Sequence, residues 1–89
     1  MNKFTKYRLV GELDTTVSGK LLYLFLLDTV DADGKIVIPQ RRVSEALGLS
    51  RSTVSQNFRR LYRRGYIDIV PRYRDDDGSR AANKYIVLD

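Results

Sequence analysis

Residues 43–61 read VSEALGLSRSTVSQNFRRL, and their spacing predicts two short helices joined by a tight turn. Gly48 can adopt a positive φ where the first helix ends, and the hydroxyl of Ser50 can cap the second helix. The apolar residues of the second helix recur at i, i+4 and i+7 and so share one face that must pack against the domain: Val54, Phe58 and Leu61. The opposite face is polar and comprises Ser52, Gln56, Arg59 and Arg63.

The positive charge of the chain is concentrated on and around this segment. The 89 residues carry a formal charge of +5. Residues 39–64 hold seven arginines and one glutamate, whereas residues 1–38 are neutral and residues 65–89 carry one net negative charge. A positive potential confined to two short helices suits a polyanion such as DNA. The alternative is a solvated arginine-rich face that has no partner.

Composition limits the other function classes. A chain of this length has room for one domain, which we expect to span residues 1–89. The sequence has no cysteine and no histidine, so thiolate chemistry and the commonest general base are missing. We therefore expect a protein that is not an enzyme, with no cofactor and no metal. The absence of an apolar run of 18 residues or a signal-peptide pattern predicts a cytoplasmic protein that does not contact the membrane.

Working outward from residues 43–61, the chain predicts an α+β fold with three helices and a small antiparallel sheet. The order is helix, strand, helix, helix, strand, strand. A helix should begin near Thr16 or Ser18 and run to Val30, and a short β-branched strand should follow. The acidic turns at 31–34 and 75–78 lack the full ligand spacing of a calcium loop. The remaining predicted elements are the strand 35–38, the helices 40–47 and 51–64, and the strands 66–70 and 84–88, which are joined by a long polar loop.

This order resembles the winged helix-turn-helix family, as found in phage and plasmid replication initiators, DnaD-type primosomal proteins and small GntR- and MarR-like transcriptional regulators. The resemblance rests on VSGKLLYLFLL at 17–27, DGKIVIPQRRVSEALGLSRSTVSQNFRRLYRRGYI at 33–67 and NKYIVL at 83–88. It implies a helix-turn-helix at 40–64 and a wing at 66–88. Asn57 departs from the family pattern, because a small or apolar residue usually packs there, so its amide needs partners.

The resemblance implies that the helix 51–64 enters the major groove of double-stranded DNA while the wing contacts the backbone or an adjacent groove. The expected base or near-base contacts are Arg51, Ser52, Ser55, Gln56 and Arg59. Gln56 and Arg59 are the sharpest candidates, since glutamine can pair with adenine and arginine with guanine.

Other residues are expected to contact phosphates. The candidates are Arg41, Ser50, Thr53 and Arg60, although Ser50 could act only as a helix cap. Arg60, Arg63 and Arg64 lie further along the helix, where phosphates, solvent or helix carbonyls are nearer than bases. In the wing the candidates are Arg72, Tyr73, Arg74 and Arg80. The acidic residues 75–77 oppose this assignment, so the tip of the wing either points away from DNA or serves another contact.

The helix that begins near Thr16 is apolar around most of its circumference and must be covered on more than one side. The residues concerned are Leu21, Leu22, Leu24, Phe25 and Leu26. Either the helix runs through the middle of the fold, flanked by the two later helices and covered by residues 4–10, or it also forms the interface of a homodimer.

Three functions follow from these expectations. The first is a small transcriptional regulator that binds specific sequences of double-stranded DNA. The second is a replication or plasmid-maintenance factor that binds an origin, and the third is a winged-helix adaptor that binds another protein. No site for a small-molecule effector is evident in the sequence.

Overall fold

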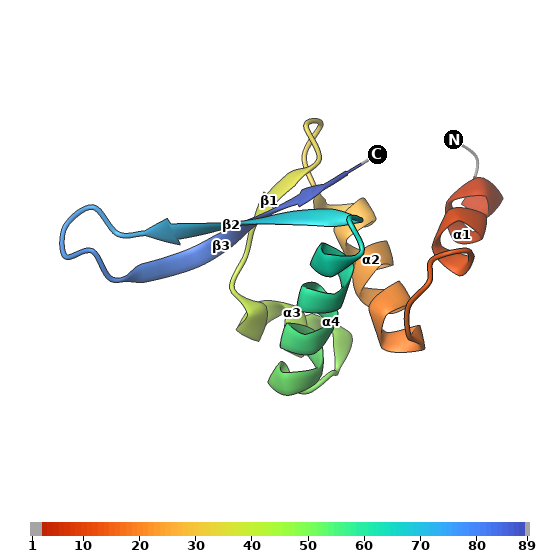
Figure 1. Ribbon diagram of the computed structural model, residues 1–89, viewed down its shortest axis with the longest axis horizontal. Helices are drawn as coiled ribbons and strands as arrows, with labels where there is room; N and C mark the ends of the chain where they lie inside the picture. Colours follow the sequence, from red (N-terminus) through yellow and green to blue (C-terminus); the bar gives the residue numbers. More distant parts are fainter. Residues whose placement is uncertain (1–2, 89) are drawn as a thin grey trace.

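The computed structural model describes residues 3–88, and within them it shows four helices and one three-stranded antiparallel sheet (Figure 1). Residues 1, 2 and 89 of the predicted domain lie outside the described part. The elements are α1 (Lys3–Gly11), α2 (Val17–Thr29), β1 (Lys35–Val37), α3 (Gln40–Leu47), α4 (Arg51–Arg63), β2 (Ile67–Tyr73) and β3 (Arg80–Val87). No helix among these is long and apolar enough to cross a membrane.

The predicted pair of helices around the turn is confirmed. α3 spans the predicted residues and follows Pro39, and it ends at Gly48, whose φ is 66°. The hydroxyl of Ser44 donates a hydrogen bond to the carbonyl of Leu49 and closes the turn. α4 starts after Ser50, whose side chain accepts a hydrogen bond from the backbone N–H of Thr53. The turn is therefore fixed by a left-handed glycine and two serine side chains.

The apolar face of α4 forms the centre of the core, as predicted. Val54, Phe58 and Leu61 are buried and pack with residues of α2, α3 and the sheet. The ring of Phe58 stacks on that of Tyr85 in β3, with centroids 4.1 Å apart and planes 14° from parallel. This stack holds α4 against the sheet, and it thereby fixes the position of the exposed face of the same helix.

α2 begins at the predicted place, because the Thr16 side chain caps it by accepting a hydrogen bond from the N–H of Gly19. Its main neighbours are α4 on one side and α1 on the other (Figure 1). The five apolar residues assigned to the core or to a dimer therefore differ in burial. Leu22 and Leu26 are fully buried, Phe25 packs against the core, Leu24 is half-buried, and Leu21 is 40% exposed.

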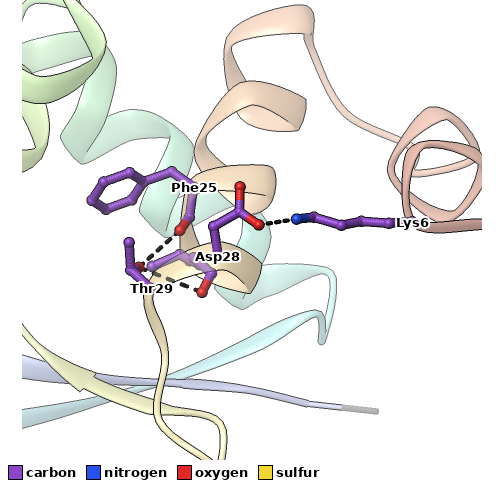
Figure 2. A network of polar contacts seen from close by, with 5 residues as sticks. Lys6, Phe25, Asp28 and Thr29 are labelled. Atoms are coloured by element: carbon purple, nitrogen blue, oxygen red, sulfur yellow. Dashed lines mark hydrogen bonds and ion pairs between the residues drawn. The ribbon is translucent and has the colours of Figure 1, made fainter. Parts of the chain in front are cut away.

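α1 is a helix that the sequence did not predict. Its apolar residues are not buried together, because Val10 is buried while Phe4 and Tyr7 are exposed. An ion pair between Lys6 and Asp28 joins α1 to α2 (Figure 2), and Lys20 donates to the carbonyl oxygen of Gly11 at 2.7 Å. Polar contacts therefore contribute to the attachment of α1, which explains why no amphipathic pattern marks it.

The sheet has the order β1-β3-β2, so the short first strand completes the sheet of the wing as expected. Before β1, the carboxylate of Asp31 accepts hydrogen bonds from the N–H groups of Asp33 and Lys35, which is an ordinary turn arrangement.

The predicted strand ends in the wing were wrong, since β2 and β3 continue into the segment that was expected to be a loop. Pro71 has no N–H for a ladder hydrogen bond, but it lies at an irregularity of the pairing between Val70 and Arg72, where the sheet tolerates it.

Candidate nucleic-acid interface

The polar face of α4 is open to solvent. Ser52, Gln56, Arg59 and Arg63 are exposed as predicted, Arg51 is exposed at the start of the helix, and Ser55 is half-buried. The amide of Gln56 lies 3.5 Å from the hydroxyl of Ser52, one turn earlier. Within the described residues, neither Arg51 nor Arg59 forms an ion pair. The five residues expected to contact bases therefore lie along one side of a single helix.

The two hydroxyls at the start of α4 bond to each other. Ser50 accepts from the N–H of Thr53 at 3.1 Å and donates to the Thr53 hydroxyl at 2.9 Å. The capping role of Ser50 is thus present, and a phosphate contact at this end would have to coexist with it. Arg41 and Arg42 are exposed in the first turn of α3.

The amide of Asn57 has the partners that its buried position requires. Its Nδ2 donates to the Thr53 carbonyl at 2.9 Å, and its Oδ1 accepts from the Thr16 hydroxyl at 3.0 Å. Asn57 is 4% exposed. The contact joins α4 to the N-terminal end of α2, so a polar bond replaces the apolar packing expected at this position.

The arginines in the second half of α4 differ from one another in their contacts. The guanidinium of Arg60 lies 3.4 Å from both the Thr16 hydroxyl and the side-chain Oδ1 of Asn57. Arg64 forms an ion pair with Asp14, which lies in the segment between α1 and α2. Arg63 is exposed and has no ion pair within residues 3–88. The sequence could not reveal these differences, because the contacts of Arg60 and Arg64 with Thr16 and Asp14 span 44 and 50 residues.

A cleft of about 620 Å³ separates α4 from the base of the wing, and we call it the wing hollow. Its polar side chains form a chain of contacts. Gln40 donates to the hydroxyl of Tyr85 at 3.1 Å, the amide of Asn83 lies 3.5 Å from that hydroxyl, and Arg80 donates to Asn83 at 3.2 Å. Arg59 of α4 also lines the cleft.

The sequence analysis missed Gln40 and Asn83. The spacing of Ala81, Asn83 and Tyr85 could have indicated that Asn83 belongs to the site. Every second residue of a strand lies on the same face of the sheet.

A second hollow of about 540 Å³ lies beside α4 and is lined by Gln56, Arg59, Arg60, Arg63 and Arg64; we call it the arginine hollow. Among the described residues, no carboxylate lines either hollow. Both therefore present hydrogen-bond donors and positive charge, which suits an anion.

The outer part of the wing projects away from the helices as a two-stranded arm (Figure 1), and residues 71–80 are all exposed. Tyr73 and Arg80 are opposite each other in the pairing of the strands. At the tip, Arg74 forms an ion pair with Asp76 at 3.3 Å. The backbone N–H of Ser79 donates to the carboxylate of Asp77 at 2.8 Å and lowers the pKa of that group below its ordinary value. The tip is therefore anionic at neutral pH, although arginines flank it.

Comparison with known sequences agrees with this geometry. Residues 26–68 match a sequence family described as winged helix-turn-helix DNA-binding, and the matched range contains β1, α3, the turn and α4. No curated protein matches the chain. The α+β fold expected from the sequence is confirmed, with α1 as an added fourth helix.

Proposed function

Because the chain carries a winged helix-turn-helix DNA-binding domain at residues 26–68, we propose that it binds specific sequences of double-stranded DNA as a small transcriptional regulator. In this proposal α4 lies in the major groove, and the wing contacts the backbone or an adjacent groove. Arg51, Ser52, Ser55, Gln56 and Arg59 face the bases. Its proposed site of action is the cytoplasm.

The observation that carries the proposal is the exposed face of α4. Gln56 and Arg59 lie one turn apart on that face, and within the described residues Arg59 forms no ion pair. Both side chains have the geometry to bond the edge of one base through two atoms. The Phe58–Tyr85 stack behind them fixes the helix, so the reading side chains project from a rigid support.

Phosphate contacts add affinity that does not depend on sequence. Arg41 at the start of α3, Ser50, Thr53 and Arg60 on α4, and Arg72, Tyr73, Arg74 and Arg80 in the wing are the proposed backbone contacts. If four to six phosphates are neutralised, log affinity should fall with log salt at a slope of roughly −3.6 to −5.4. A flat salt response would contradict DNA binding through this surface.

The specific roles can be separated by substitution. Gln56→Ala and Arg59→Ala should each weaken binding to the preferred duplex by about 1–3 kcal/mol and relax the choice of base. Arg41→Ala is the matched control, because it should weaken preferred and random DNA by equal factors. Equal losses on both DNAs for all three variants would show that α4 does not read bases.

Binding to an origin of replication would use the same surface, so the position of the bound site in the genome distinguishes this alternative from a regulator. A protein adaptor would bind DNA weakly and without sequence preference. The positive charge of the arginine hollow makes this alternative less favourable.

A homodimer would allow two copies of α4 to read two half-sites. Tyr7, Leu9 and Leu21 are 58%, 48% and 40% exposed on α1 and α2. Light scattering at high concentration measures the mass, and a strictly monomeric value would refute the dimer.

A further inference from the structure

The two hollows lie on opposite flanks of α4. Ser55 lines the wing hollow, and Arg60 lines the arginine hollow. These residues are five positions apart, which places them about 140° apart around the axis of a helix with 3.6 residues per turn. Arg59 lines both hollows and forms the ridge between them. The exposed face of α4 is therefore bordered on each side by a depression rich in donors.

The dimensions of DNA match this arrangement. A helix with its side chains is about 10–12 Å across, and the major groove is about 12 Å wide. A helix that fills the groove therefore has one phosphate strand along each of its flanks. One phosphate strand therefore lies on each side of the helix, just as one hollow lies on each side of Arg59.

Each flank has the chemistry that a phosphodiester strand requires. On the wing side, Arg80 supplies positive charge, and the amides of Asn83 and Gln40 supply further donors. On the other side, Arg60 and Arg63 supply the charge with no carboxylate paired to either in the described structure.

Arg64 shares its charge with Asp14 on this second side. The Asp14 side chain is 77% exposed. When Arg64 binds a phosphate instead, water can solvate the Asp14 carboxylate, so breaking the ion pair costs little free energy.

We propose that the two hollows bind the two phosphate strands of one major groove, the wing hollow one strand and the arginine hollow the other. This inference rests on the proposed function and deepens it. Arg63 and Arg64 become contacts to the second strand, Gln40 and Asn83 become contacts to the first, and Arg59 stands between the strands above the bases. The depth and the direction of α4 in the groove are then set from both sides.

The test uses the tightest-binding duplex selected from a random pool, with single neutral methylphosphonates placed along each strand in turn. In the unaltered protein, neutral positions on both strands should weaken binding. In Arg63→Ala, the phosphate positions that Arg63 contacts on one strand should lose their sensitivity to neutralisation, and in Arg80→Ala the positions that Arg80 contacts on the opposite strand should lose theirs. Each variant should reduce the salt slope by about 1.

Arg8→Ala is the matched control, since Arg8 is exposed on α1, which lies on the side of α2 away from α4. It should change neither the slope nor the strand pattern. Loss of sensitivity on the same strand in Arg63→Ala and Arg80→Ala would overturn the inference and leave DNA binding intact. An Arg63→Ala protein that behaves like Arg8→Ala would also overturn it. Insensitivity of the unaltered protein to every methylphosphonate, together with a flat salt response, would instead refute the proposed function.

Discussion

The first turn of α2 has no room for a methyl group at Gly19. A Cβ at this position would lie 2.5 Å from Oγ1 and 3.0 Å from Cγ2 of Thr15, and 3.1 Å from Oδ1 of Asn57. Gly19→Ala therefore sets two effects against each other. Alanine favours the helix by about 0.5–1 kcal/mol, whereas overpacking costs about 1–3 kcal/mol. We expect a net loss of about 0.5–2 kcal/mol in the free energy of unfolding.

This change is measurable by urea or thermal denaturation followed by circular dichroism. In a domain of this size, 1 kcal/mol corresponds to a shift in Tm of about 4–8 °C. The control is Gly11→Ala at the end of α1, because a Cβ there meets no atom within 4 Å. That variant should be as stable as the unaltered protein or slightly more stable.

A second variant tests the cause of the loss. Thr15→Ala removes both of the closest atoms, and it also removes a buried hydroxyl oxygen that has no hydrogen-bond partner in the described structure. The double variant Thr15→Ala/Gly19→Ala should therefore recover most of the lost stability. If Gly19→Ala stabilises the protein, or if the double variant is no better than Gly19→Ala alone, the steric argument is wrong.

Two further predictions concern the turn between α3 and α4 and the tip of the wing. Gly48→Ala should lower the free energy of unfolding by about 1 kcal/mol, because the φ of 66° is in the left-handed region that disfavours a Cβ. Denaturant titration measures the loss, and an unchanged midpoint would contradict the argument. The pKa of Asp77 is lowered chiefly by the backbone N–H of Ser79, so this carboxylate stabilises the folded tip above the ordinary aspartate pKa, and the contribution is lost as the pH falls through the lower folded value. An NMR titration should place the Asp77 midpoint below the ordinary value, and Ser79→Ala should keep most of the lowering, since the backbone donor remains; an ordinary midpoint would refute the hydrogen bond.

The sequence predicted the helix-turn-helix most accurately because strong local signals mark its limits. Pro39 has a fixed φ suited to a helix start, Gly48 and Gly65 can adopt the positive φ that ends a helix, and Ser50 can cap one. The limits of both helices are therefore predicted to within one residue of the structure. The wing was predicted less well. Pro71 favours the end of a strand locally, but the pairing with β3 continues past it by means of an irregularity that only the partner strand reveals.

At the site, the sequence identified the exposed residues of α4 because helical periodicity separates them from Val54, Phe58 and Leu61. It could not assign the partners of Asn57 and Arg64, since these contacts depend on how residues 12–16 fold back onto α4. The wing hollow was missed for the same reason. Its walls come from α3, α4 and β3, and their approach is a property of the tertiary structure.

The irregularity at Pro71 also affects how copies of this protein behave when they are crowded. β2 is an outer strand of the sheet, and such a strand can recruit a strand from a neighbouring molecule. Pro71 has no N–H that could pair with a strand from a neighbouring molecule. The irregular pairing bends β2 at this point, and the adjacent Arg72 adds a positive charge. Copies of the protein can therefore come close together without the sheet growing from chain to chain into an aggregate.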